Sequence, residues 1–107
     1  MKILALEFSS HLRSVAVGDG MEHGEIRMLG SAEDADFRGG TGLMLIDRAM
    51  QQARMKPADV AVIALGLGPG SYTGIRSAIA IAQGWHFGRD VKVVGISSTL
   101  CLAEEAR

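Results

Sequence analysis

The fold is decided by residues 60–96, VAVIALGLGPGSYTGIRSAIAIAQGWHFGRDVKVVGI, where a helical pattern separates two strand-like runs. Residues 60–67 are apolar without alternation, as expected of a strand that is buried on both faces, and residues 91–96 are interpreted as a further strand. The helix between them has an apolar face formed by Ile75, Ile79 and Ala82. A strand, a helix and a strand in this order predict two parallel strands joined by a right-handed crossover.

Three more strands are predicted upstream of this unit. Residues 3–6 form another continuous apolar run, and residues 14–17 form a strand that Gly18-Asp19-Gly20 closes, since Asp-Gly is typical of hairpin turns. A weaker, alternating strand covers about residues 24–29. Short turns between these strands predict an antiparallel meander. The polar, glycine-rich residues 31–42 are interpreted as a loop.

Two further helices are predicted, one after this loop and one at the end of the chain. Thr41 is placed to cap the first, because its hydroxyl can accept from an unpaired backbone N–H, and Pro57 marks its end. Met44 and Leu45 widen the apolar stripe of this helix, and a serine at 97–98 caps the last one. The apolar positions are Leu43, Ile46, Met50 and Ala53 in the former and Leu100, Leu102, Ala103 and Ala106 in the latter.

The predicted order is three strands, a helix, a strand, a helix, a strand and a helix, within a single domain of residues 1–107. The unrelieved apolarity of residues 3–6 places the first strand at the centre of the sheet, which gives the strand order 3-2-1-4-5. This α/β arrangement, a five-stranded mixed sheet with three helices, is the ribonuclease-H-like half of an actin-like fold.

Composition limits the classes of function. Hydrophobic residues make up 48% of the 107, enough for the core of one domain. The net charge of −1 offers no basic excess for strong RNA binding by this chain alone. The single cysteine, Cys101, excludes an internal disulfide and is interpreted as a buried apolar residue. Because no signal peptide or membrane-length apolar run is recognised, the cytoplasm is the expected compartment.

The loop GPGSYTGIR at residues 68–76 has the most functional information. It joins a buried strand to a helix N-terminus, where unpaired N–H groups and the helix dipole favour anions. Thr73 is the predicted N-cap of that helix. The candidate anion- or nucleotide-binding residues are Gly68, Gly70, Ser71, Thr73, Gly74 and Arg76.

Known motifs match this loop poorly. A P-loop would need a lysine directly after Gly74, and a nucleophile elbow would need serine where Tyr72 stands. A dinucleotide fingerprint would need its third glycine one position earlier and an acidic residue at the end of the next strand. The remaining alternative is a tight strand-to-helix turn, whose glycines serve backbone geometry alone.

The same nine residues resemble the signature of the TsaB (YeaZ) family, a relative of TsaD in the actin-like ATPase superfamily. Residues 3–6 with 14–17 resemble the opening hairpin of that family, and residues 94–100 resemble its fifth strand and third helix. The resemblance implies a non-catalytic partner subunit of TsaD in the synthesis of N6-threonylcarbamoyladenosine in tRNA. Such a subunit would bind TsaD, act with TsaE through that complex, contact tRNA only indirectly, and form a homodimer when alone.

The sequence departs from the family pattern at its first strand. The family usually ends this strand with Asp and a small hydroxyl residue, whereas Glu7 and Phe8 stand here, which favours a solvated strand end over a metal or phosphate ligand. TsaD-type catalytic subunits also have two metal-binding histidines on the first helix, and no histidine lies between His23 and His86. The resemblance therefore implies no catalytic residue, no metal site and no tightly bound cofactor, although ATP or ADP could bind at the partner interface.

The first two helices are the predicted partner surface. In the family they pair with their counterparts on TsaD, or on a second copy, as a four-helix bundle. The first helix has more apolar residues than one stripe needs, and small residues on the second, Gly84 among them, permit close approach. A simpler alternative is that the surplus apolar residues complete a small core. The predicted contacts are Leu43, Met44, Leu45, Tyr72, Ile75 and Ile79.

The resemblance implies that this sequence contains only the first of two similar family domains, and that the uncovered face between them favours self-association. The alternative function from another class is a nucleotide-binding ATPase or phosphotransferase of the actin-like superfamily. ATP turnover by the isolated chain would favour that alternative, whereas capture of TsaD would favour the partner subunit. A peptidase activity, once attached to this superfamily, has no support in these residues.

Overall fold

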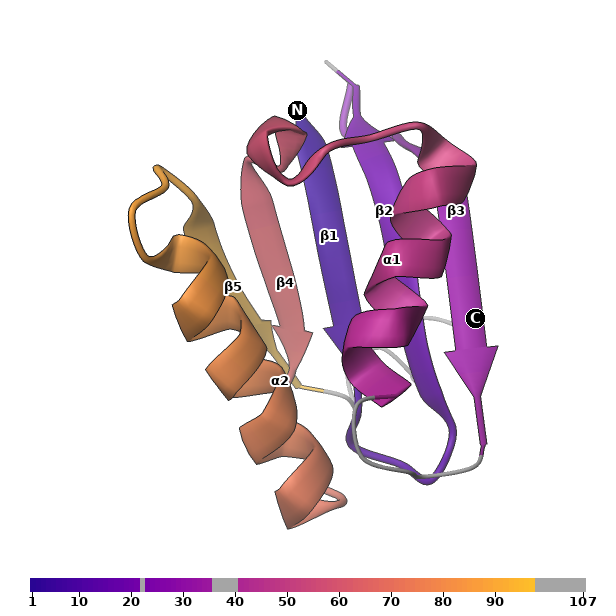
Figure 1. Cartoon of the computed structure of the whole chain (residues 1–107), viewed down its shortest axis with the longest axis vertical. Helices are drawn as coiled ribbons and strands as arrows, with labels where there is room; N and C mark the ends of the chain where they lie inside the picture. The colour runs from indigo at the N-terminus through magenta and orange to yellow at the C-terminus, as the bar shows by residue number, and fades with distance from the viewer. Residues whose placement is uncertain (22, 36–40, 98–107) are drawn as a thin grey trace.

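The computed structural model describes residues 1–21, 23–35 and 41–97 (Figure 1). The predicted third helix lies outside these residues. The described elements are strands β1 (Lys2–Glu7), β2 (Arg13–Gly20), β3 (Ile26–Asp34), β4 (Val62–Gly66) and β5 (Lys92–Ile96), helices α1 (Thr41–Ala53) and α2 (Tyr72–His86), and a 3-10 turn at Pro57–Asp59. Neither α1 nor α2 is long and apolar enough to cross a membrane.

The strand order is β3-β2-β1-β4-β5, which confirms the predicted mixed sheet with the first strand at its centre. β1 pairs antiparallel with β2 and parallel with β4, β2 pairs antiparallel with β3, and β4 pairs parallel with β5. Both α1 and α2 cover the same face of the sheet, the one toward the viewer in Figure 1. This placement follows from two successive crossovers of the same, right-handed sense.

The core fills the space between the sheet and the two helices. Side chains alternate along β1, so Leu4 and Leu6 face the helices while Ala5 faces the other side. Each fully buried leucine stabilises the fold by about 1.5–3 kcal/mol. The opposite face of the sheet has small side chains around a shallow cavity of about 220 Å³. The helix-side core comprises Leu4, Leu6, Phe8, Val15, Val17, Leu45, Ile46, Ala49, Met50, Ile63, Leu65, Ala78 and Ala82.

The β2–β3 hairpin corrects two predictions. Asp19-Gly20 does not form the turn, because both residues belong to β2 and pair with β3. The chain reverses between Met21 and Glu25 instead, where Gly24 has φ 81°. β3 also continues to Asp34, so the loop predicted from residue 31 begins later. The long strand is held by α1, since the N–H of Ser31 donates to Gln52 Oε1 at 3.1 Å.

The face that α1 buries also differs from the predicted stripe. Leu43 is 60% exposed, whereas Leu45, interpreted as lying outside the stripe, is only 1% exposed. Contact with the sheet decides this rotation: at Gly30 of β3 a Cβ atom would overlap the carbonyl oxygen of Ala49. α1 begins at Thr41, but the capping role predicted for the Thr41 side chain lies outside the described residues.

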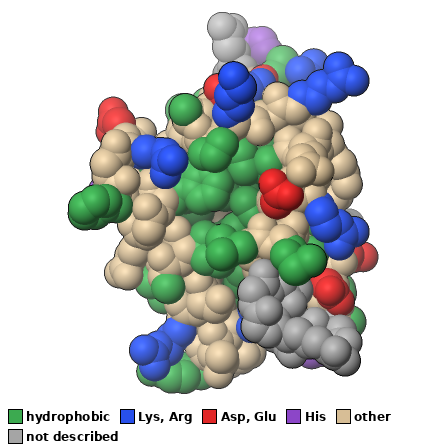
Figure 2. Space-filling model, viewed as in Figure 1, with side chains coloured by type: hydrophobic (Ala, Val, Ile, Leu, Met, Phe, Trp, Pro, Cys, Tyr) green, Lys and Arg blue, Asp and Glu red, His purple; other side chains and the backbone are tan. Residues whose placement is uncertain are grey.

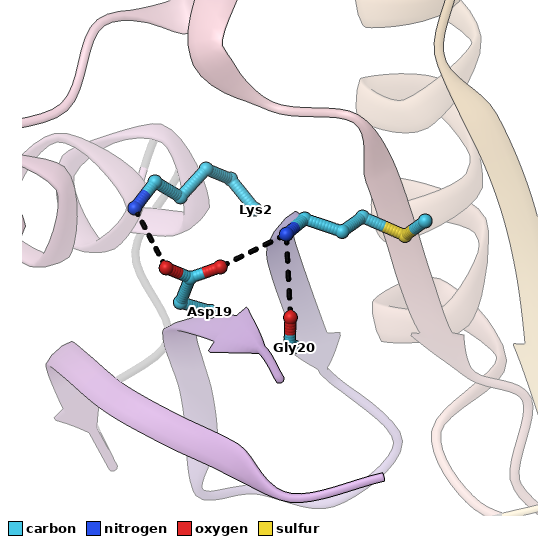
Figure 3. Close-up of polar contacts among 4 residues, drawn as sticks. Lys2, Asp19 and Gly20 are labelled. Atoms are coloured by element: carbon cyan, nitrogen blue, oxygen red, sulfur yellow. Dashed lines mark hydrogen bonds and ion pairs between the residues drawn. The ribbon is translucent and has the colours of Figure 1, made fainter. Parts of the chain in front are cut away.

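A cluster of charges holds the start of β1 to the end of β2 (Figure 3). The carboxylate of Asp19 accepts from the N-terminal ammonium at 2.9 Å and from Lys2 Nζ at 3.0 Å. The N-terminal ammonium, followed by Lys2, holds the pKa of Asp19 below its usual value. The N-terminus also donates to the carbonyl of Gly20 at 3.3 Å. These bonds explain why the Asp-Gly pair extends β2 instead of turning.

We expect this cluster to make stability depend on pH. A carboxyl group whose pKa is lowered by folding stabilises the native state above its unfolded pKa, about 3.9, and this stabilisation is lost as the pH falls below that value. Asp19→Asn should therefore lower the Tm at neutral pH, with a gap to wild type that closes as the pH falls through about 4. Thermal unfolding across this pH range checks it, with Asp90→Asn, an exposed aspartate, as the control. A gap that stayed constant at acidic pH would contradict the assignment.

Candidate functional site

The loop after β4 is packed closely against the end of β1. A Cβ atom at Gly70 would overlap the carbonyl oxygen of Ser9, and one at Gly74 would overlap that of Phe8. The N–H of Ser71 donates to the same Ser9 carbonyl at 2.5 Å. Both glycines are thus required because two backbone segments touch. This agrees with the interpretation of the loop as a tight strand-to-helix turn whose glycines serve backbone geometry.

The first turn of α2 is capped by Ser71, not by Thr73 as the sequence predicted. Ser71 has an extended backbone, with φ −61° and ψ 114°, and its Oγ accepts from the N–H of Gly74 at 3.1 Å. Thr73 is the second residue of the helix, and its side chain is exposed. The cap sits at 71 because the bond from this residue to Ser9 holds its backbone extended, directly before the helical turn.

These bonds reduce what the loop offers to an anion. The N–H groups of Ser71 and Gly74 both have acceptors inside the chain. An oxyanion would compete with those acceptors for the same donors. Arg76 and Thr73 do share a shallow hollow of about 350 Å³ with Tyr72 and Ser77, beside the loop. Nucleotide binding at the six loop residues stays a prediction.

Glu7 lies at the carboxyl end of β1 and is not the solvated strand end that the sequence predicted. Its side chain is half-buried, and its carboxylate accepts from both the N–H and the Oγ of Ser9. A Cβ atom at Gly66 of β4 would overlap this carboxylate. Within the described ranges, no three His, Cys, Asp or Glu side chains are close enough to share a metal ion. The Glu7 side chain therefore connects the carboxyl ends of β1 and β4, which run parallel to each other.

Phe8, the other departure from the family pattern, is fully buried in the core. Its ring lies under the first turn of α1, where a Cβ atom at Gly42 would be 2.9 Å from Phe8 Cε2 and 3.3 Å from Ile81 Cδ1 of α2. The Arg13 guanidinium lies over the same ring, with its Cζ 5.2 Å from the centroid. Phe8 thus fills the space where β1 and both helices meet.

The residues predicted to contact a partner fall into three groups. Leu43, Met44 and Tyr72 are 60%, 66% and 73% exposed. Ile75 and Ile79 are half-buried. Leu45 belongs to the core, so its assignment to the partner surface was wrong, because α1 turns this side chain toward the sheet. The exposed members lie at the N-terminal ends of both helices.

A groove between α1 and α2 was missed by the sequence prediction. It has a volume of about 560 Å³, and its lining includes Leu43 of α1 and Ile81 and Trp85 of α2. Figure 2 shows hydrophobic side chains gathered in the hollow at the centre of this face. Trp85, the single tryptophan of the chain, was the available signal, because a large aromatic side chain next to Gly84 on a helix of small residues has few positions to pack.

Comparisons with known proteins agree with one another. A family model described as TsaD, tRNA N6-adenosine threonylcarbamoyltransferase, matches residues 42–107. The TsaB protein of Escherichia coli, named a tRNA threonylcarbamoyladenosine biosynthesis protein, is 32% identical over 99% of this chain and 44% of its own length. The TsaB protein of Haemophilus influenzae is 39% identical over 60% of this chain and 27% of its own length.

Among solved structures, YeaZ from Pseudomonas aeruginosa superposes with a TM-score of 0.81 and 30% identity, over 98% of this chain and 47% of that one. A second structure, described as an uncharacterised protein with similarity to peptidase YeaZ from the same organism, gives a TM-score of 0.80 and 29% identity. The chain spans less than half the length of these relatives.

The two candidate caps of α2 can be separated by mutation. Ser71→Ala removes the acceptor for the N–H of Gly74, so it should lower the free energy of unfolding by about 1 kcal/mol. Thr73→Ala, the matched control on an exposed side chain, should change it by less than about 0.5 kcal/mol. Urea unfolding of the three proteins measures both values. A larger loss for Thr73→Ala than for Ser71→Ala would overturn the assignment of the cap.

Proposed function

The chain belongs to the TsaB family, within the wider family that the TsaD model describes, and from that premise we propose that it is a partner subunit without catalytic residues of its own. It would act in the biosynthesis of tRNA threonylcarbamoyladenosine, the process for which its E. coli relative is named. Its direct partner would be the TsaD of the same organism. TsaE and tRNA would be reached through that complex, in the cytoplasm.

The observation that carries this proposal is the apolar surface at the N-terminal ends of α1 and α2. Leu43, Met44 and Tyr72 are each more than half exposed. Exposed apolar side chains that gather on one face mark protein interaction sites. Aromatic residues and methionine are enriched at such interfaces. A second copy of the chain would use the same helices when TsaD is absent.

The geometry near the loop supports a role other than catalysis for its residues. Glu7 holds Ser9, and Ser9 holds Ser71, so the side chain and backbone groups at the ends of β1 and β4 already bind one another. Phe8 fills the space above them. A reaction centre at this position would have to break these contacts before it could bind a substrate. The loop is accordingly interpreted as a packing element.

Substitutions on the two helices test the partner role. Leu43→Glu and Tyr72→Glu place a charge on exposed positions, so the fold should persist while affinity for TsaD falls at least about tenfold, or about 1.4 kcal/mol. Titration calorimetry with purified TsaD gives the affinities. The matched control is Met28→Glu, an equally exposed residue on edge strand β3. If the wild-type chain failed to bind TsaD, or if all three variants bound equally, the proposal would be wrong.

A second candidate, a nucleotide-binding ATPase or phosphotransferase, is favoured by one observation, the hollow that Thr73, Arg76 and Ser77 form beside the loop. Because the hollow is shallow, we propose that ATP or ADP binds there only when TsaD covers the hollow and supplies further contacts. Calorimetry with ADP should show binding to the complex and not to the chain alone, and Arg76→Ala should weaken it. Turnover of ATP by the chain alone would favour the enzyme, and a lack of binding in both samples would exclude the nucleotide.

A further inference from the structure

The groove between α1 and α2 has the dimensions of a small-molecule site. Its main part has a volume of about 560 Å³, and a second hollow of about 240 Å³ continues from it along α1 to Met55. Leu43 and Trp85 line both parts, so the two hollows adjoin at these side chains. Cavities of about 300–1,000 Å³ hold organic ligands, and most are lined by apolar groups with a few polar ones among them. The groove in the centre of Figure 2 fits this description.

The lining of the second hollow favours a flexible, aliphatic ligand. It includes Ile46, Met50 and Met55, and methionine adapts its shape to what it contacts. Trp85 is the only aromatic residue among the described residues that line the two parts. A flat aromatic ligand would therefore find one ring to stack on, whereas an alkyl chain can contact the whole length of the hollow.

The indole of Trp85 offers a hydrogen-bond donor in the middle of this apolar surface. Within the described part of the chain, its Nε1 atom is buried and has no acceptor. A buried donor without an acceptor is unfavourable and rare in native structures. Because Trp85 lines both hollows and no acceptor fixes its ring, a turn of the indole would bring the N–H into the groove. An acceptor atom of a ligand would satisfy it there.

The charges around the groove select an anionic head group. Arg13 and Arg89 line the main part, and no Asp or Glu is among the described residues around it. The Cζ of Arg89 lies 5.9 Å from the centroid of the indole ring, so this guanidinium and the Trp85 N–H are neighbours. Asp47 lines the second hollow and would repel an anion there. A guanidinium binds a carboxylate through two parallel hydrogen bonds, and an indole N–H can donate to the same group.

We propose that this groove binds a small aliphatic carboxylate. Its head group pairs with Arg89 and the N–H of Trp85, and its alkyl chain passes between Leu43 and Trp85 into the second hollow, toward Met50. This site goes beyond the proposed function and does not rest on it. Binding of the ligand is measured on the chain without TsaD, so either proposal can fail while the other stands.

Titration of the whole chain with octanoate tests the site, since the emission of Trp85, the single tryptophan, reports binding beside the indole. Octanoate should change this emission. Octan-1-ol, the uncharged molecule with the same chain length, should bind at least about tenfold more weakly. Arg89→Gln should weaken octanoate binding about tenfold and leave octanol binding unchanged. Arg27→Gln, on an exposed residue of β3 outside the groove, is the matched control and should bind octanoate as the wild type does.

Two further variants test the space and the donor separately. Gly84 lines the main part, and a Cβ atom there would meet nothing within 4 Å. Gly84→Leu should therefore keep or raise the Tm, because leucine is a better helix former, and should bind octanoate at least about tenfold more weakly. Its matched control is Gln83→Leu, an exposed neighbour that does not line the groove. Trp85→Phe keeps a ring and removes the donor, so calorimetry should show weaker binding of octanoate and unchanged binding of octanol.

Four results would overturn the inference. A lack of octanoate binding below the concentration at which it forms micelles would show that the groove takes no such ligand. Equal affinity for octanoate and octanol would reduce the site to an unselective apolar surface. Octanoate binding that Arg89→Gln and Gly84→Leu leave unchanged would place the ligand elsewhere, such as the hollow of about 220 Å³ on the opposite face of the sheet. Normal octanoate binding by Trp85→Phe would remove the indole donor from the site.

Discussion

The contact between the end of β1 and the start of α2 is the constraint on which the remaining structure depends. The carbonyl groups of Phe8 and Ser9 lie so close to Gly74 and Gly70 that neither glycine has room for a side chain. This contact sets the distance of α2 from the sheet, and within it the N–H of Ser71 donates to the carbonyl of Ser9. It also carries Phe8 into the core beneath α1, so one backbone approach fixes the positions of both helices.

Once the helices are fixed, the core can cover only part of their apolar surface. α2 faces the sheet with Gly74, Ala78 and Ala82, which let it lie close to β1 and β4. α1 covers β2 and β3, and its N-terminal residues Leu43 and Met44 point away from the sheet. The two helices meet the sheet over different strands, so a groove remains between them. The apolar surface of the two helices is thus exposed because they pack on different strands of a small sheet.

Sequence patterns located the candidate surface but not its details. They identified the two helices and named Leu43, Met44 and Tyr72 as partner contacts, and all three are exposed, although Leu43 was also counted in the buried stripe of the first helix. They also singled out the loop at residues 68–76, whose glycines serve packing in the structure. The groove could not be foreseen, since a space between two helices depends on their separation, which no local pattern contains. Leu45 was misplaced for a related reason, because the rotation of α1 is decided by its contact with β3.

The sequence by itself determined the order of the described elements, the sheet topology and the central position of β1, because continuous apolar runs and a right-handed crossover leave few arrangements. Tertiary structure decided which hydroxyl caps α2, where the β2–β3 hairpin turns and which face of α1 is buried. In the first two cases a residue far away in the sequence decides the local structure. The bond to Ser9 makes Ser71 the cap in place of Thr73, and the bond to the N-terminal ammonium keeps Asp19 in β2. In the third, apolar residues are so dense in α1 that helical periodicity fits more than one face. A residue pattern specifies the period of an element, whereas the rotation of α1 is specified by its contact with β3.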